Sequence, residues 1–202
     1  MTTAPDVRIC FAGDSYVAGT GDRSGLGWVG RVVAAALAGG HRLTTYNLGV
    51  RGDTSRQVAD RLGAELGPRL TGGDEHRVVL AFGVNDTVLR DGRVRLALAA
   101  SVEALHHAVD VAGAASVLVV GPPAVDDDAQ NVRLRGLTDA FAQECAGRGL
   151  PFVDTFGITL DDATWRREVG EGDGFHPDAA GYAALAAVVE PPFLAWLTAG
   201  YT

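Results

Sequence analysis

The sequence contains an uninterrupted apolar run, Val78-Val79-Leu80-Ala81-Phe82, and a second one, Val117-Leu118-Val119-Val120. Neither run alternates with polar residues, which is typical of strands that are covered by other elements on both faces. Such strands occur mainly in parallel sheets, where helices connect one strand to the next. The two runs therefore predict the inner strands of an α/β fold.

The alternation of strand-like and helical patterns extends in both directions from these runs. The predicted strands are Val7–Ala12, Leu43–Leu48, Arg77–Phe82, Ser116–Gly121 and Pro151–Asp154. The predicted helices are Trp28–Ala38, Thr54–Leu66 with Thr54 as N-cap, Val94–Ala112, Gln130–Arg148 and Asp178–Leu197. No repeat or linker separates these units, so we predict one domain over residues 1–202. It is a three-layer α/β/α fold with a five-stranded parallel sheet.

Composition excludes several classes of function. The 202 residues are 47% hydrophobic and 21% charged, as in a soluble globular protein, and the net charge is −8. This charge argues against nucleic acid and against an anionic membrane as the main partner. All 17 basic residues are arginines, which excludes a lysine Schiff base, a Ser–Lys dyad and a phosphate-loop lysine. We expect no cofactor and no metal.

The ends of the chain and its two cysteines bear on its compartment. Cys10 falls in a predicted strand and Cys145 in a predicted helix, so we expect two packed thiols and no disulfide. Met1–Asp6 lacks the pattern of a signal peptide, and no apolar run is predicted to span a membrane. We therefore expect a cytoplasmic protein, and the bias toward Ala, Gly, Val and Arg suggests a bacterial one.

Position along the sheet sorts the histidines. Ligands of open parallel sheets bind beyond the carboxyl ends of the strands. His41 and His76 precede strands, at the opposite edge, and His106 and His107 fall within a predicted helix. Only His176 follows the last strand at the productive edge. It is the candidate general base.

The same rule selects one serine. Ser15 follows the first strand directly in Phe11-Ala12-Gly13-Asp14-Ser15, and Gly13 permits a tight exit from that strand. The other serines are at a strand start, within helices or in the glycine-rich first loop; they are Ser116, Ser101, Ser55 and Ser24. We predict that Ser15 is a nucleophile. The alternative is a serine that only caps a helix.

Three further groups complete a set for acyl transfer. Asp173 precedes His176 by three residues, so its carboxylate reaches the Nδ1–H of the imidazole across a turn. In the alternative, Asp173-Gly174 only forms a turn and His176-Pro177 only begins a helix. Gly49 follows the second strand and Asn85 the third, and both are candidate donors to an oxyanion, together with the Ser15 N–H. Taken singly, the motifs that contain Gly49 and Asn85 are more often turns or caps.

These motifs resemble the SGNH hydrolases, also called GDSL lipases and esterases. Gly13-Asp14-Ser15 is similar to the first block of that family, Gly49 to the second and Gly83-Val84-Asn85-Asp86 to the third. Asp173 with His176 is similar to the last block. Tyr16 replaces the usual leucine of the first block, at a position that the family varies. The similarity covers nearly the whole chain.

The resemblance implies a flavodoxin-like fold and an acyl-serine intermediate on a small-molecule ester. Ser15 would be the nucleophile, His176 the base and Asp173 the residue that orients it, with the oxyanion held by Ser15, Gly49 and Asn85. The family includes thioesterases and carbohydrate deacetylases, so an acetylated sugar or metabolite or a thioester remains an alternative substrate. A binding domain of the same fold without turnover is the rival from another class.

Four other features have structural interpretations that we prefer. Gly25-Leu26-Gly27-Trp28-Val29-Gly30 matches a dinucleotide-binding fingerprint, but it does not follow a strand directly. Asp126-Asp127-Asp128 is more typical of a solvated loop than of a metal site. The polar stretch Thr155–Gly172 is predicted as a lid or a plain surface loop. The residues expected to line an acyl or alcohol pocket are Tyr16, Trp28, Val50, Arg51, Trp165 and Phe175.

Overall fold

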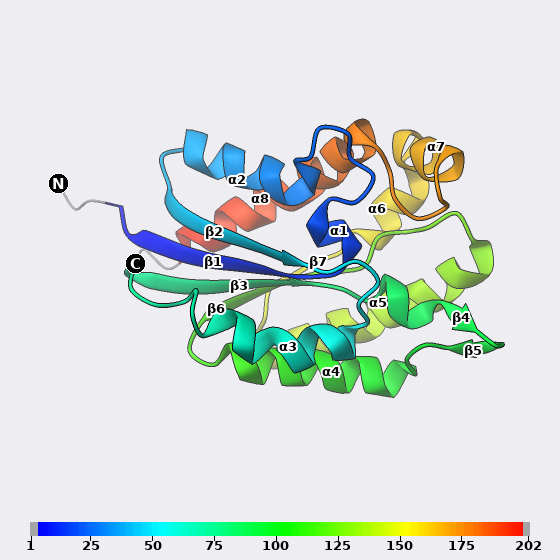
Figure 1. Cartoon of the computed structure of the whole chain (residues 1–202), viewed down its shortest axis with the longest axis horizontal. Coiled ribbons are helices and arrows are strands. Elements are labelled where there is room, and N and C mark those ends of the chain that lie inside the picture. Colours follow the sequence, from blue (N-terminus) through cyan, green and yellow to red (C-terminus); the bar gives the residue numbers. More distant parts are fainter. Residues whose placement is uncertain (1–3, 200–202) are drawn as a thin grey trace.

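A computed structural model describes residues 4–199 and contains a five-stranded, wholly parallel sheet (Figure 1). The strands are β1 (Asp6–Gly13), β2 (Arg42–Gly49), β3 (Glu75–Ala81), β6 (Ser116–Val120) and β7 (Phe152–Val153). Their order is β2-β1-β3-β6-β7, the doubly wound arrangement of flavodoxin-like folds. The predicted fold class and all five predicted strands are confirmed.

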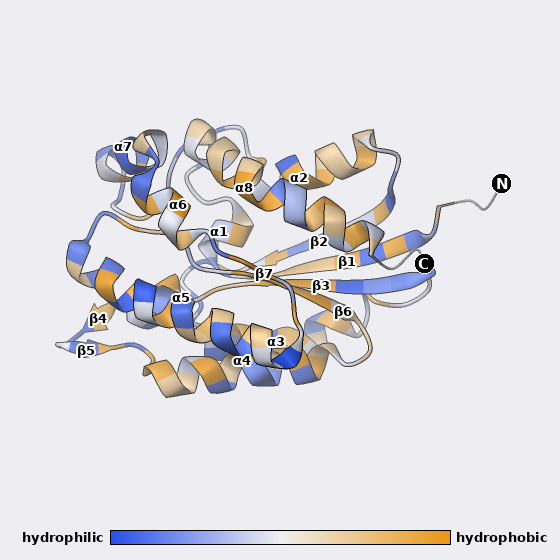
Figure 2. Cartoon of the chain, turned by 180° about the vertical axis from the view of Figure 1, so that it is seen from behind, coloured by the Kyte–Doolittle hydropathy of each residue, from blue (hydrophilic) through white to orange (hydrophobic). Residues whose placement is uncertain are grey.

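Helices cover both faces of the sheet. α2 (Gly27–Ala38) and α8 (Ala179–Thr198) lie on one face, and α3 (Ser55–Leu66), α4 (Leu98–Ala112) and α5 (Asp128–Arg148) lie on the other (Figure 1). Side chains of β1 alternate between two apolar cores, Phe11 toward α2 and α8, and Cys10 toward α3 and α4. In Figure 2 the inner strands are hydrophobic along most of their length.

A hairpin interrupts the segment that was predicted as the start of the third helix. That helix begins at Leu98 and not at Val94, because β4 (Leu89–Arg90) and β5 (Arg93–Val94) pair in an antiparallel ribbon. The two residues that connect them, Asp91 and Gly92, have φ angles of 52° and 75°. Positive φ at both positions is the geometry of a type I′ hairpin turn, for which Asp-Gly is a strong signal.

The segment predicted as a lid or a surface loop is helical. It forms α6 (Phe156–Asp161) and α7 (Ala163–Glu171), and Trp165 and Val169 of α7 are buried. Asp162 caps α7 by accepting a hydrogen bond from the Trp165 N–H. A helix anchored through a fully buried tryptophan packs into the core, so the segment is not a plain surface loop.

The two cysteines are free buried thiols, as predicted. Burial raises the pKa of both Cys10 and Cys145 to about 11. We expected no apolar run that could span a membrane, and α8 corrects this expectation. By length and composition alone, α8 is long and apolar enough to cross one. Its side chains Tyr182 and Phe193 are fully buried in the core that α8 forms with α2 and the sheet.

Candidate active site

Ser15 lies where the backbone leaves β1, an inner strand of the sheet. β1 ends at Gly13, and Ser15 is the first residue of the short helix α1 (Ser15–Ala18). A Cβ atom at Gly13 would come within 1.9 Å of the Ala81 carbonyl oxygen, so only glycine allows this exit. Asp14 caps α1 by accepting a hydrogen bond from the Tyr16 N–H at 3.0 Å.

A continuous chain of hydrogen bonds joins Ser15 to the other end of the sequence. His176 Nε2 lies 2.7 Å from Ser15 Oγ, and His176 Nδ1 lies 2.7 Å from Asp173 Oδ2. The other carboxylate oxygen of Asp173 accepts the backbone N–H groups of Phe175 and His176 at 3.0 and 2.9 Å. Partial burial would raise the pKa of Asp173, but these hydrogen bonds outweigh it and lower the pKa to about 2. Asp173 is therefore ionised at neutral pH.

Tyr16 supports the loop that carries the histidine. Its hydroxyl donates to the Phe175 carbonyl oxygen at 2.6 Å, and its ring centroid lies 5.2 Å from that of His176. The Tyr16 ring is also stacked on Trp165 of α7. The residue next to Ser15 thus fixes the backbone next to His176, which restricts the imidazole to one position.

Asn85 is brought to the same edge by the 3-10 helix η1 (Val84–Thr87) that follows β3. Its side-chain Nδ2 donates to the Asp53 carbonyl oxygen at 3.0 Å and, at a longer 3.3 Å, to Asp14 Oδ2. Asp14 is buried directly beneath the site, and burial raises the pKa of its carboxyl to about 7. The Asn85 amide therefore contacts Asp14, the residue that caps the helix beginning at Ser15.

Gly49 does not lie with the other predicted residues, so that prediction is corrected. Its N–H donates to Asn47 Oδ1 at 3.0 Å, and a Cβ atom at Gly49 would come within 2.2 Å of the Ala18 nitrogen. Glycine at this position serves the close packing of β2 against α1. The glycine that does line the cavity beside Ser15 and Asn85 is Gly52.

Gly52 lies in the turn that follows β2. The Asp53 N–H closes this turn on the Val50 carbonyl oxygen at 3.2 Å, and Gly52 has φ +85°. Within residues 4–199, the Gly52 N–H makes no hydrogen bond to another backbone group outside the helices and strands. The sequence signal that could have found Gly52 is the stretch Arg51-Gly52-Asp53, because Gly followed by Asp just beyond a strand is typical of a turn.

Two polar residues that were not predicted to support the site, one buried and one half-buried, hold its floor. Asp86 is fully buried and accepts hydrogen bonds from Ser55 N–H at 2.8 Å and Ser55 Oγ at 2.6 Å, which ties η1 to the start of α3. Arg61 Nη2 donates to the carbonyl oxygens of Gly13 and Leu48 at 2.9 Å each. It thereby joins the carboxyl ends of β1 and β2.

A cavity of about 380 Å³ opens over these groups. Tyr16, Arg51 and Phe175 line it, as predicted, and so do the unpredicted Val88, Arg90 and Arg95. Two predicted lining residues are instead core residues, because Trp28 and Trp165 are each 1% exposed. Val50 is exposed on the surface and does not line the cavity.

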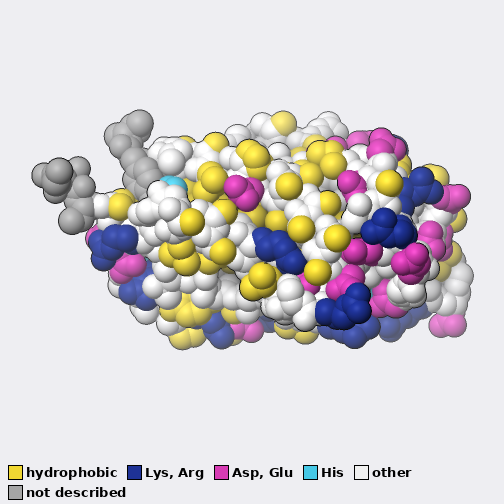
Figure 3. Space-filling view, turned by 90° about the horizontal axis from the view of Figure 1, so that it is seen from above, with side chains coloured by type: hydrophobic (Ala, Val, Ile, Leu, Met, Phe, Trp, Pro, Cys, Tyr) yellow, Lys and Arg dark blue, Asp and Glu magenta, His cyan; other side chains and the backbone are white. Residues whose placement is uncertain are grey.

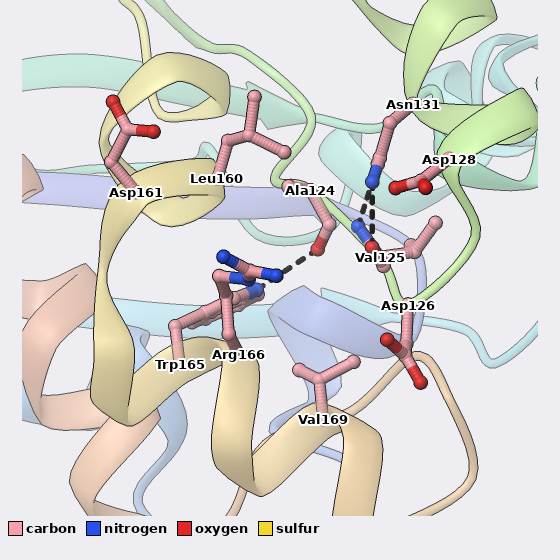
Figure 4. A pocket seen from close by; sticks show the side chains of 10 residues that line it. All are labelled: Ala124, Val125, Asp126, Asp128, Asn131, Leu160, Asp161, Trp165, Arg166 and Val169. Atoms are coloured by element: carbon pink, nitrogen blue, oxygen red, sulfur yellow. Dashed lines mark hydrogen bonds between the residues drawn. The ribbon is translucent and has the colours of Figure 1, made fainter.

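A second cavity, of about 220 Å³, lies between α5, α6 and α7 (Figure 4). Figure 4 shows Asp126, Asp128 and Asp161 around it, on separate segments, with the Trp165 Nε1–H donating to the Ala124 carbonyl oxygen at 2.9 Å. Asp127 caps α5 by accepting the Gln130 N–H. Over the described range 4–199, no group of three or more His, Cys, Asp or Glu side chains is arranged to hold a metal ion.

Comparison with protein families identifies the chain. Residues 11–184 match the model of the GDSL-like lipase/acylhydrolase family, which spans every segment of the site described above. The chain belongs to this family. A search of curated protein sequences gave no match.

Solved structures of similar proteins agree with this assignment. A lipase/acylhydrolase from Enterococcus faecalis is 25% identical, with a TM-score of 0.78 over 93% of this chain and 95% of that one. A psychrotrophic esterase from Pseudoalteromonas sp. is 19% identical, with a TM-score of 0.74 over 96% and 99%. A family 3 carbohydrate esterase from Clostridium thermocellum is 18% identical, with a TM-score of 0.76 over 96% and 98%. This GDSL-family protein is an ester-hydrolysing enzyme with the fold of these proteins.

Proposed function

We propose that this enzyme hydrolyses carboxylic esters through an acyl-serine intermediate, with Ser15 as nucleophile, His176 as general base and Asp173 as the residue that orients the imidazole. The observation that carries the proposal is the unbroken Ser15–His176–Asp173 chain, with both contacts at 2.7 Å. Hydrogen-bond reach between nucleophile and base, and between base and orienting group, is the geometric signature of this chemistry.

The first half of the reaction forms the acyl-enzyme. His176 Nε2 accepts the Ser15 hydroxyl proton as Oγ attacks the ester carbonyl carbon, and the carbonyl oxygen becomes an oxyanion. The intermediate collapses by breaking the bond to the alcohol oxygen, which leaves with the proton from His176. Asp173, with its pKa of about 2, stays ionised throughout and stabilises the imidazolium. His176 then deprotonates a water that attacks the acyl-serine and releases the carboxylic acid.

Three donors around the cavity are available to the oxyanion. They are the Ser15 N–H, the Gly52 N–H and the Asn85 amide, and all three residues line one cavity with His176. The Asn85 Nδ2 contact to Asp14 is long, at 3.3 Å, so an oxyanion competes with it at little cost. Donors that are held in place before the reaction are worth more than donors that must reorient.

Covalent labelling with a fluorophosphonate tests the proposal. We expect stoichiometric modification of Ser15, located by mass spectrometry of peptides, together with burst kinetics on p-nitrophenyl esters. Ser15→Ala should abolish both. Ser24→Ala is the matched control, because Ser24 lies in the loop before α2 and does not line the cavity.

The outcome separates the enzyme from a binding domain of the same fold. A protein that neither reacts with the probe nor turns over any ester in a panel of graded acyl esters and thioesters would contradict the proposed function. Burst-phase product from Ser15→Ala would contradict the assignment of the nucleophile. The panel also reports which acyl length, and whether an ester or a thioester, is preferred.

A further inference from the structure

The cavity over Ser15 has a charge opposite to that of the chain. The chain carries a net charge of −8, yet three arginines line the cavity, Arg51, Arg90 and Arg95, against a single carboxylate, that of Asp173. Elsewhere at the end of the molecule where α7 lies, charged side chains of both signs are mixed (Figure 3). The excess of guanidinium groups is therefore a local feature of the cavity and not a property of the surface.

Two of the three arginines have no anionic partner. Arg51 Nη2 lies 3.7 Å from Asp173 Oδ2, an exposed and weak pair. Among residues 4–199, no carboxylate lies within 4.0 Å of Arg90 or Arg95. The Arg95 guanidinium donates two long hydrogen bonds, at 3.4 Å each, to the amide oxygens of Asn85 and Gln57. This guanidinium is half-buried, and that burial together with the charge of Arg90 lowers the pKa of Arg95.

The β4–β5 hairpin holds these charges at the cavity. Leu89 pairs with Val94, and Arg90 pairs with Arg93, so two cationic side chains stand directly opposite each other. Like charges at opposed strand positions are destabilising. Side chains of a strand alternate between its faces, and Arg90 lines the cavity while its neighbour Leu89 is 49% exposed. The hairpin thus keeps an unfavourable cationic face toward Ser15, which an anionic ligand would stabilise.

We propose that Arg90 and Arg95 bind an anionic group, a carboxylate or a phosphate monoester, that the ester substrate carries in addition to its scissile bond. Guanidinium groups recognise both anions through paired N–H donors. The inference rests on the proposed esterase function and adds a substrate class to it. One anionic group held by local arginines is compatible with a net negative chain, since the nearest charges dominate at contact distance.

Two matched pairs of esters distinguish the carboxylate from the phosphate. Ethyl hydrogen adipate and ethyl hexanoate differ by a carboxylate on the acyl side, and monoacetylglycerol phosphate and monoacetylglycerol differ by a phosphate on the alcohol side. We expect the charged member of one pair to exceed its neutral partner at least ten-fold in kcat/KM, followed in a pH-stat. The pair that shows this preference identifies the source of the anion.

Substitution of Arg90 links the preference to the hairpin. Arg90→Met should lower kcat/KM for the preferred charged ester at least ten-fold and that for its neutral partner less than two-fold. Arg56→Met is the matched control, because Arg56 is exposed on α3, outside the hairpin, and does not line the cavity. Equal rates on charged and neutral esters in the wild type, or equal losses on both in Arg90→Met, would overturn the proposal.

Calorimetry with adipate and with glycerol 3-phosphate tests the anion site without turnover. If the wild-type protein binds one of these anions and Arg90→Met binds it at least ten-fold more weakly, the result supports the anion site even if the esters chosen are poor substrates. Absence of binding together with hydrolysis that ignores charge refutes the anion site and leaves the esterase intact. Absence of probe labelling at Ser15 and of all hydrolysis refutes the proposed function instead.

Discussion

The carboxyl group of Asp14 should make the stability of the protein depend on pH in an unusual direction. Asp14 is 1% exposed, and burial, reinforced by the charges of Asp86 and Asp53, raises its pKa from 3.8 to about 7. Hydrogen bonds from the Tyr16 N–H and the Asn85 amide offset only part of this rise. Between pH 4 and pH 7 the folded protein therefore holds a proton that the unfolded chain has released.

The sign and size of the effect follow from linkage. A folded state that binds more protons than the unfolded state loses stability as pH rises. Each pH unit in this window costs about 1.4 kcal/mol, so the Asp14 carboxyl lowers the free energy of unfolding by about 4 kcal/mol from pH 4 to pH 7. Above pH 7 both states are ionised at this group, and its contribution no longer changes.

Asp14→Asn removes this titration while it keeps an oxygen that accepts the Tyr16 N–H. We expect the difference in free energy of unfolding, variant minus wild type, to rise by about 4 kcal/mol between pH 4 and pH 7. Urea denaturation at half-unit steps of pH measures it. A difference that changes by less than about 1 kcal/mol over the window would refute the reasoning.

Asp22→Asn is the matched control, with the opposite sign. Burial would raise the pKa of Asp22, but hydrogen bonds from Arg31, Ser24 and Gly27 outweigh it and lower the pKa to about 2. A lowered pKa gives stability that is present above the unfolded value and is lost as pH falls through the folded value. The corresponding difference curve should therefore be flat from pH 5 to pH 7 and should change only in acid.

Three further substitutions test the site and the packing beside it, and a fourth is a control. Asn85→Ala should lower kcat by about 10²–10³-fold while the protein remains folded, since one oxyanion donor is lost, and unchanged steady-state kinetics would exclude that role. Asp173→Asn should lower kcat by roughly 10²–10⁴-fold, because an amide N–H facing His176 Nδ1 favours the wrong tautomer; a variant with more than a tenth of the activity speaks against an orienting role. Gly49→Ala should lower the free energy of unfolding by at least about 2 kcal/mol in urea, since its Cβ would lie 2.2 Å from the Ala18 nitrogen. Gly136→Ala, in α5 with no atom within 4 Å of the new Cβ, should not be destabilising.

Much of the architecture was predictable from the sequence because it depends on local pattern. The apolar runs that formed β3 and β6 are covered on both faces, and no other environment suits such strands. The order of the strands and the rule that ligands bind at their carboxyl ends then reduced the histidines and serines to His176 and Ser15. That selection needed only the position of each residue before or after a strand.

The errors arose where tertiary packing decides between patterns that look alike. Gly49 ends β2 and Gly52 lies three residues beyond it, and only the packing of the first against α1 and the turn at the second decide which N–H stays free. Trp165 was predicted to line a pocket because it lies in a long segment at the catalytic edge, but α7 turns it into the core. Burial of one side chain within a polar stretch carries little signal in a single sequence.

The structure separates the groups expected to perform the reaction from those expected to choose the substrate. Ser15, Asn85 and His176 are held by part-buried hydrogen bonds, such as those from Asn85 to the Asp53 carbonyl oxygen and between His176 and Ser15. Arg90 lies on a hairpin that makes no part of the sheet. One fold supports many specificities when a rigid scaffold carries the catalytic groups and surface loops contact the substrate, because loops change at little cost to the core. The unpaired charge of Arg90 is therefore better explained by the substrate than by the fold, since the fold gains nothing from it.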